Sequence, residues 1–390
     1  MYLDLHILQS FAPANLNRDD TGSPKECIFG GARRARISSQ SLKRAIREAF
    51  RDDAILPPER LATRTKQVVR LVAGRLVERG WEQAEARTAV TRALRAIGWN
   101  ISDEGESDAL ALVAADQVEA LADAIERHRT ALTAAAAEAD ATAEPRRGRA
   151  RAKPEAGTEI APEAKRAFSA ALDLAGSIDL ALFGRFIADL PDKNIDGAAY
   201  VAHSLSTHAL DAETDYFTAV DELQTAAEPG AGMLGLQGYN ASLHYRYATL
   251  DLRSLRERLG EPDLLRLAVE AFVRASVVAI PSGKQHGHAA FNRPSFVLAV
   301  VRDDAPESLA NAFLRPVRAG QGDDDLLRAS VAALEAEWRA HRAMYGDEGI
   351  RHLAVASLTT EDLGVFAPAQ VPLKTLVAAV ATRAAVEVME

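Results

Sequence analysis

Apolar and polar residues alternate along the N-terminus in the manner of a β-strand. Leu3, Leu5 and Ile7 occupy every second position and are separated by Asp4 and His6, which predicts a strand over residues 2–10. Three later segments carry patterns that also predict strands, at residues 241–252, 294–301 and 351–358.

After the first strand, the apolar residues from Leu42 to Phe50 recur with the period of an α-helix. Ser38 or Ser39 is suited to cap this helix, and Pro57 with Pro58 closes the unit. The apolar stripe of the helix consists of Leu42, Ala45, Ile46, Ala49 and Phe50. Further helices are predicted at residues 60–79, 82–97, 116–140, 163–175, 263–280, 323–345 and 373–389.

Three segments interrupt these patterns. Residues 141–162 mix arginines with prolines and glycines, which predicts a flexible surface loop. Its basic cluster could contact nucleic acid, but a solvated linker is the favoured interpretation. Residues 178–187 are an apolar run, and residues 194–238 are rich in small and polar side chains, which predicts a long hairpin or arm. The outline favours an α+β fold: a ferredoxin-like or RNA-recognition-type βαββαβ palm with a helical domain inserted after its first helix.

Composition narrows the class of protein. Of 390 residues, 48% are hydrophobic and 26% are charged, as in ordinary globular proteins. Cys27 is the single cysteine, so an intrachain disulfide and a cysteine-rich metal site are both excluded. The N-terminus lacks the pattern of a signal peptide, and no stretch of about twenty residues is free of charge. We therefore expect no membrane span and a reducing, cytoplasmic location.

Positive charge is concentrated in one place. Residues 33–51 hold seven basic residues and one acidic residue, a local charge of +6, whereas the whole chain carries −9. The other 371 residues together therefore carry −15. This concentration is typical of a local site for a polyanion, and the acidic remainder argues against indiscriminate nucleic-acid binding.

The basic helix has the features of a phosphate site. Lys43, Arg47 and Arg51 recur every four residues opposite the apolar stripe, with Arg44 beside them. Like charges at this spacing each cost about 0.2–0.5 kcal/mol unless an anion is present. The polar residues at the helix start add donors that contact phosphates and sugars without reading bases: Ser38, Ser39, Gln40 and Ser41. A solvated helix face is the alternative interpretation.

Residues 281–288 form a second candidate. Gly283 and Gly287 permit close backbone approach, and Lys284, Gln285 and His286 supply donors. The segment lacks the glycine before lysine and the Ser or Thr after it that a Walker A loop needs. It could clamp a phosphate backbone, although spacing alone favours a plain glycine turn.

Histidines and aromatic residues of the arm give weaker signals. His203, His208, His286 and His288 suggest metal binding or acid–base chemistry together with Asp211, Glu213 and Asp215. No known metal-ligand spacing is present, so structural histidines are the favoured interpretation and we expect no metal. Tyr216 and Phe217 could stack on a base, but packing within the protein or on a neighbouring subunit is favoured.

Taken together, these motifs resemble the CasC family, the backbone subunit of the type I-E CRISPR surveillance complex Cascade. The resemblance runs from near the N-terminus to about residue 317, and its segments are 15–20, 28–31 with the arginine run, 38–44, 182–185, 201–208, 215–223, 245–248, 283–285 and 289–292.

The resemblance implies a non-catalytic protein without a cofactor, shaped like a right hand. It implies a palm at 1–58, 178–193 and 239–390, helical fingers at 59–177 with the flexible loop 141–162, and a hairpin thumb at 194–238. Copies of such proteins stack head to tail along one CRISPR RNA, contact other Cascade subunits, and present the guide for pairing with target DNA.

Particular residues are implied as well. The resemblance places on the guide-RNA backbone Arg18, Lys25, Ser38, Ser39, Gln40, Lys43, Arg44 and Arg47, with Lys284, Gln285 and His286 nearby. Phe217 with Thr218 would be the thumb wedge at a kinked nucleotide, and Phe186 would pack near the displaced base. Which of Arg33, Arg34 and Arg36 contact RNA stays open.

Two other functions remain as alternatives. One is a metal-independent CRISPR RNA endonuclease that uses His203, His208 or His286 as acid and base, although no nucleophile–base pair is evident. The other is a filament-forming protein that merely tolerates RNA.

Overall fold

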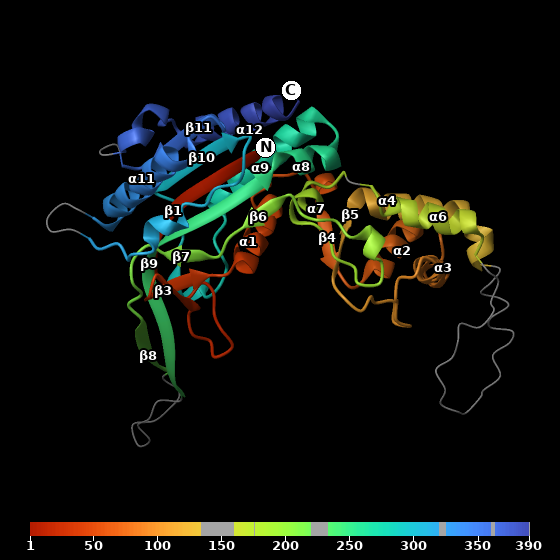
Figure 1. The fold of residues 1–390 in the computed structure, drawn as a ribbon. Coiled ribbons are helices and arrows are strands. Elements are labelled where there is room, and N and C mark those ends of the chain that lie inside the picture. The colour runs from red at the N-terminus through yellow and green to blue at the C-terminus, as the bar shows by residue number, and fades with distance from the viewer. Residues whose placement is uncertain (134–159, 175, 220–232, 320–324, 360–362, 390) are drawn as a thin grey trace, which may run out of the picture. The chain divides into compact units, whose positions relative to one another are not determined.

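The structure, a computed structural model, describes residues 1–133, 160–174, 176–219, 233–319, 325–359 and 363–389 (Figure 1). The chain forms two compact units. The first comprises Met1–Ile55 and Ala199–Glu390, and the second is Leu56–Ala198. No helix within the described ranges is long and apolar enough to cross a membrane.

An antiparallel sheet organises the first unit. Its strands are β1 (Tyr2–Ala14), β2 (Glu26–Phe29), β3 (Ala32–Ile37), β6 (Ala199–Val201), β7 (Ser204–Ser206), β8 (Glu213–Ala219), β9 (Met233–Asp251), β10 (Phe296–Arg302) and β11 (Ile350–Ser357). The order across the sheet is β11-β10-β1-β9-β7-β3-β2, and β6 and β8 also pair with β9. Each pair of strands is antiparallel. The strands expected at 2–10, 241–252, 294–301 and 351–358 are all present.

The connectivity contains a βαββαβ succession. Along the chain it runs β1, α1 (Ser39–Asp52), β6, β9, α9 (Pro262–Val278) and β10, while across the sheet the strands lie in the order β10-β1-β9-β6. Hence β1 lies between the strands that precede and follow α9. This is the succession of elements that the sequence pattern predicts.

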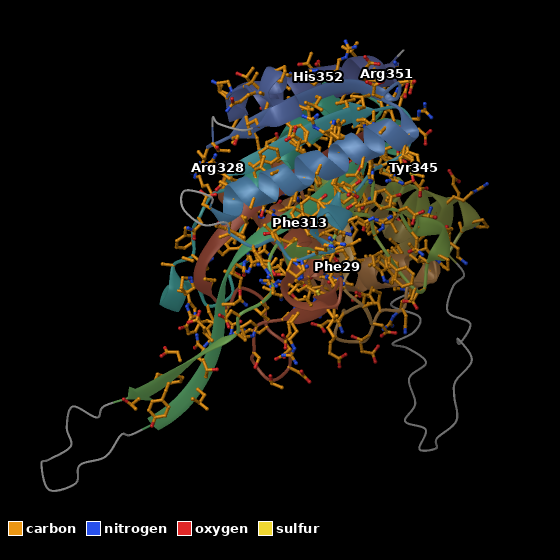
Figure 2. All side chains as sticks on the ribbon, turned by 60° about the vertical axis from the view of Figure 1, so that its left-hand side comes forward. Phe29, Phe313, Arg328, Tyr345, Arg351 and His352 are labelled. Carbon is orange, nitrogen blue, oxygen red and sulfur yellow. The ribbon has the colours of Figure 1, made fainter. Side chains whose placement is uncertain are left out.

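Helices cover both faces of the sheet. On one face α1 packs on α9, and α9 packs on α12 (Leu373–Met389); α8 (Leu252–Leu259) joins them. On the other lies α11 (Leu326–Tyr345), seen in Figure 2 with Arg328 and Tyr345 near its two ends. Tyr245, Leu298 and Trp338 belong to the core beneath α11. The remaining short helices are α10 (Gln285–His288), η3 (Ala310–Phe313) and η4 (Gly364–Ala369).

The long strand β9 extends beyond the sheet as an arm. Its C-terminal part pairs with β1, from Asn240 to Asp251. Its N-terminal part, Met233 to Tyr239, pairs instead with β8. The arm expected within 194–238 is therefore a hairpin whose second strand continues into the core sheet (Figure 1).

The second unit is mainly helical. Its helices are η1 (Pro58–Arg60), α2 (Val68–Glu78), α3 (Gln83–Ala96), α4 (Ala115–Arg127), α6 (Pro162–Ala171), α7 (Ile178–Phe183) and η2 (Pro191–Lys193). A two-stranded sheet pairs β4 (Ala62–Thr65) with β5 (Ala111–Ala114). The predicted helix at 60–79 is therefore wrong over its first turns, because residues 62–65 form a strand that pairs with residues 111–114. Residues 141–159 of the predicted loop lie outside the described residues, and Pro162 already begins α6.

The structure also groups residues 178–198 with the second unit, whereas the sequence suggested a palm segment at 178–193. Arg185 explains this placement. Its guanidinium is buried and donates to the carbonyls of Leu172 and Lys193 and to the Gln117 side chain, at 2.9–3.0 Å. The Ala198 amide donates to the Ala181 carbonyl at 3.0 Å, which closes the segment on itself.

Two histidines are buried in the sheet of the first unit. Burial lowers the pKa of His6 and of His244 to about 3. The His6 ring lies 2.9 Å from the Tyr245 hydroxyl, and the His244 ring lies 2.8 Å from the Ser204 hydroxyl. Both rings are therefore neutral at pH 7 and act as structural hydrogen-bonding groups.

This burial predicts a pH dependence of stability. Below pH 6.5 the unfolded chain takes up a proton on each histidine that the folded chain does not, so the free energy of unfolding falls as the pH drops. Each group contributes a slope of about 1.4 kcal/mol per pH unit. Asp4 acts in the opposite direction, because burial raises its pKa to about 6.

The variant His244→Asn isolates one of these slopes, since Asp4 and His6 are unchanged in it. Urea titrations between about pH 4.5 and about pH 6.5 measure it. As the pH drops, the unfolding free energy of the variant should fall less steeply than that of the wild type. Equal slopes would show that His244 is protonated in the folded chain.

Candidate nucleic-acid interface

The N-terminus of α1 is held by the loop that follows β1. Ser38 is the cap, because its hydroxyl accepts a hydrogen bond from the Ser41 amide at 3.3 Å. The Ser38 amide in turn donates to the Asn17 side-chain oxygen at 2.8 Å. Ser39 is half-buried and Gln40 is exposed at the first turn. The helix start therefore has a fixed position next to residues 15–25.

The cationic face of α1 is only partly neutralised. Arg44 forms an exposed ion pair with Glu48 at 2.6 Å, a pair of low energetic value in water. Lys43 and Arg47 are half-buried on the same helix. Among the residues that the structure describes, Lys43 forms no ion pair.

The loop after β1 presents Arg18 and Lys25. Its backbone is closed by the Lys25 amide, which donates to the Asn17 carbonyl at 2.8 Å, and by a bridge between Arg18 and Pro24. Asn15 is fully buried and its amide donates to the carbonyls of Gly22 and Gly238, both at 3.0 Å. Because Gly238 lies in β9, the loop is tied to the base of the arm.

The segment 281–288 packs against the same loop. A Cβ atom on Gly283 would lie 2.2 Å from the Leu16 carbonyl oxygen, so only glycine permits this approach. Lys284 and His286 are exposed, whereas Gln285 turns inward and donates to the carbonyls of Pro281 and Ala290 at 3.3 and 3.4 Å. The lysine and the histidine are therefore available to a ligand, and the Gln285 amide is engaged within its own loop.

These segments enclose a recess of 340 Å³. It is lined by three stretches that are far apart in sequence: residues 16–19, residues 41–48 of α1, and residues 281–283. The recess is open and mostly polar in its lining side chains, with Arg18 and Arg44 at its wall together with Asp19 and Glu48. The structure thus brings together three segments that carry residues predicted to contact RNA. They are the loop after β1 with Arg18, helix α1, and the loop that carries Lys284.

Arg36 and His203 extend the positive region past the helix start. The His203 ring nitrogen lies 3.2 Å from the Arg36 guanidinium and 3.3 Å from the Ser39 amide. Partial burial, followed by the charges of Arg36 and Lys25, lowers the pKa of His203. The ring is therefore neutral at pH 7 and serves as an acceptor. Arg36 and the anchors Asn15 and Asn17 were not among the predicted site residues.

The arginine run is not a loop, contrary to the appearance of its sequence. Residues 26–37 form the β2–β3 hairpin, turned by Gly30 and Gly31 with φ of +59° and +77°. Strand pairing then separates three neighbouring arginines. Arg34 is fully buried and donates to the carbonyls of Ser206, Thr207 and Phe313 at 2.7–3.0 Å.

Arg33, in contrast, is exposed and pairs with Glu26 at 3.2 Å. The structure therefore separates the roles that the sequence left open. Arg34 holds the fold together, Arg33 lies at the surface of the hairpin, and Arg36 faces the helix start.

The arm carries Phe217 and Thr218. The Phe217 ring lies across Gly235 of the paired strand, where a Cβ atom would approach it to 2.3 Å, and 39% of Phe217 remains exposed. Tyr216 and Leu236 pair on the opposite face of the hairpin and are 60% and 73% exposed. Phe217 is therefore supported by the arm itself and presents an exposed edge.

Phe186 and His208 are the remaining candidates. Phe186 belongs to the second unit and is 72% exposed there. His208 is engaged with the main chain through both ring nitrogens, at 2.8 Å from the Ala209 carbonyl and 3.2 Å from the Leu243 amide. Within the described ranges, no three His, Cys, Asp or Glu side chains lie together as a metal site would require.

The burial of Arg34 predicts different effects for neighbouring substitutions. Arg34→Met would remove a donor from three buried carbonyls, of which that of Thr207 keeps the Val317 amide, and should lower the unfolding free energy by about 3 kcal/mol or more. Arg33→Met removes only an exposed ion pair and should change it by about 0.5 kcal/mol or less. Urea titration of both variants measures the difference, and equal effects would contradict the assignment of Arg34.

Comparison with known proteins places this geometry in context. One solved structure, described as "CRISPR RNA-guided surveillance complex, pre-nicking", contains a chain that is 29% identical with a TM-score of 0.79. Another, described as "CRISPR RNA-guided surveillance complex", contains a chain that is 25% identical with a TM-score of 0.71. Each alignment covers 97% of this chain and 100% of the other. No curated protein matches.

These similarities agree with the resemblance found in the sequence. The family of CT1975-like proteins matches residues 3–379, nearly the whole chain. The chain therefore belongs to the CT1975-like protein family.

Proposed function

We propose that this chain is a non-catalytic, multi-copy backbone subunit of a type I-E Cascade complex that acts in the cytoplasm. In this role it grips the sugar-phosphate backbone of a CRISPR RNA without regard to sequence. Support comes from the family and from solved relatives whose descriptions name an RNA-guided surveillance complex.

The observation that carries the proposal is the convergence of cationic segments around the start of α1. Arg18 and Lys25 come from the loop after β1, Lys43 from α1, and Lys284 from the loop after α9. None of these four forms an ion pair within the described part of the chain. Unpaired cations beside the positive end of a helix dipole favour a ligand with several phosphates.

In this proposal the donors contact the RNA backbone. Phosphates and sugars are the commonest nucleic-acid targets of lysine, arginine, serine and main-chain amides. A protein that holds only the backbone leaves the bases free to pair with a target DNA strand. Base pairing then supplies sequence specificity, as in other RNA-guided effectors.

The other parts of the chain have roles in the same proposal. The first unit is the palm, the β8–β9 arm is the thumb, and the second unit contains the fingers. Successive copies pack head to tail, and such a heterologous contact forms an open helical filament unless other subunits cap it. In this arrangement Phe217 and Thr218 displace one base at a kink of the RNA, and Phe186 packs near that base.

The absence of catalysis is part of the proposal. His208, one of the acid–base candidates, has both ring nitrogens engaged with the main chain, which suits a structural role. His203 accepts from Ser39 and Arg36 at the edge of the phosphate region. Cleavage of a precursor CRISPR RNA by the purified chain, if lost in His208→Ala, would overturn this part.

The double variant Lys25→Gln with Lys43→Gln tests RNA binding. Each removed phosphate contact should reduce the slope of log affinity against log salt by about 0.7, so the double variant should lose about 1.4. The loss should be equal for two unrelated, unstructured RNA oligonucleotides in fluorescence-anisotropy titrations. The matched control, Arg253→Gln with Lys374→Gln, removes the same charge from exposed positions on α8 and α12 and should keep the wild-type slope.

Two outcomes would contradict the proposal. A loss confined to one RNA sequence would show that bases are read, and an unchanged slope would place the RNA elsewhere on the chain.

A further inference from the structure

We infer that Arg246 and Gln9, two buried residues on strands of the core sheet, are positioning residues for the loop that presents Lys284. This inference rests on the proposed function, because it concerns how one of the phosphate-binding lysines is held. Neither side chain has access to a ligand, since Gln9 is 0% exposed and Arg246 is 5% exposed.

The two side chains form one chain of hydrogen bonds across the sheet. Arg246 lies on β9 and Gln9 on the neighbouring β1. One Arg246 nitrogen donates to the Gln9 side-chain oxygen, and the other donates to the Ser276 carbonyl of α9 at 2.7 Å. Within the described residues Arg246 has no carboxylate partner, so its contacts are all with neutral oxygens.

The guanidinium determines the orientation of the Gln9 amide. Arginine can only donate, so the Gln9 oxygen must face Arg246 and the Gln9 amide nitrogen must face the other way. That nitrogen donates to the Asn292 carbonyl at 2.7 Å. The Asn292 carbonyl can only accept, so the two ends of the Gln9 amide favour the same orientation, and without Arg246 only the carbonyl end would hold it.

Asn292 is the C-terminal anchor of the loop. Its side-chain oxygen also accepts from the Ala12 amide of β1 at 3.1 Å, so both its main chain and its side chain are bound to the same strand. The other end of the loop is fixed where Gly283 packs on the Leu16 carbonyl. Lys284 lies between these anchors, and its direction depends on both.

The energetic cost of Arg246 supports a positioning role. Burial lowers the pKa of Arg246 to about 10, so the group is still protonated at pH 7 and its charge is held away from water. A buried charge with only neutral partners stabilises a fold less than an apolar side chain of similar volume would. What the arginine supplies is a fixed orientation of Gln9, and through it a fixed loop.

The variant Gln9→Glu separates positioning from stability. It keeps the size of the side chain and gives Arg246 a carboxylate partner, so the thermal midpoint should stay equal or rise. It also replaces the donor to Asn292 with a second acceptor, which repels the carbonyl and releases the loop. Affinity for an unstructured RNA oligonucleotide should then fall about threefold to tenfold, the loss of one charge-assisted contact.

A double-mutant cycle identifies the residue through which Gln9 acts. Gln9→Glu combined with Lys284→Gln should bind RNA no more weakly than Lys284→Gln alone. Lys43 lies on α1 rather than on the loop. When Gln9→Glu is combined with Lys43→Gln, the losses of RNA affinity from the two substitutions should therefore multiply. Asn292→Ala, at an exposed position that should tolerate substitution, provides a second variant with the same expected cycle if Gln9→Glu fails to fold.

The outcomes are distinguishable from failure of the proposed function. If Lys43→Gln and Lys284→Gln both bind RNA as the wild type does, the proposed function fails. If those two weaken binding but Gln9→Glu and Asn292→Ala do not, or if their effects multiply with Lys284→Gln, only the positioning role is overturned.

Discussion

The structure of the first unit depends on the continuity of one strand. β9 is 19 residues long, and it pairs with β8 in the arm and with β1 in the core sheet. A two-stranded hairpin is marginally stable by itself. Because its second strand is built into a covered sheet, the arm has a fixed base from which Phe217 is presented. Asn15 strengthens that base by donating to Gly238, where the arm leaves the sheet.

The same base gathers the cationic segments. Asn17 fixes the start of α1, Gly283 allows the loop after α9 to approach the loop after β1, and Gln9 and Ala12 hold the far end of that loop. These contacts are made by neutral groups, so the lysines of the region are left for an anion. The excess of acidic residues elsewhere in the chain then confines a polyanion to this region.

The sequence predicted the elements that follow one regular period, and these include four strands of the core sheet (β1, β10, β11 and the C-terminal part of β9), the helix capped by Ser38, and the arm. It failed where partners are distant. Residues 62–65 become a strand because residues 111–114 pair with them, and no local pattern reveals that. The arginine run concealed a hairpin, although Gly30-Gly31 is a recognised signal for a two-residue turn. Likewise only the fold distinguishes Arg34, which is buried, from Arg33 and Arg36.

The central claim is that this chain binds the sugar-phosphate backbone of a guide RNA. The most direct test is to identify the nucleic acid that copurifies with the full-length chain. The chain should be purified with and without nuclease, with its absorbance ratio recorded at 260 and 280 nm and any extracted RNA sized and sequenced. The account predicts copurifying RNA that resists nuclease and, when CRISPR RNA is coexpressed, has one size. Protein that carries no nucleic acid under either condition would contradict the account.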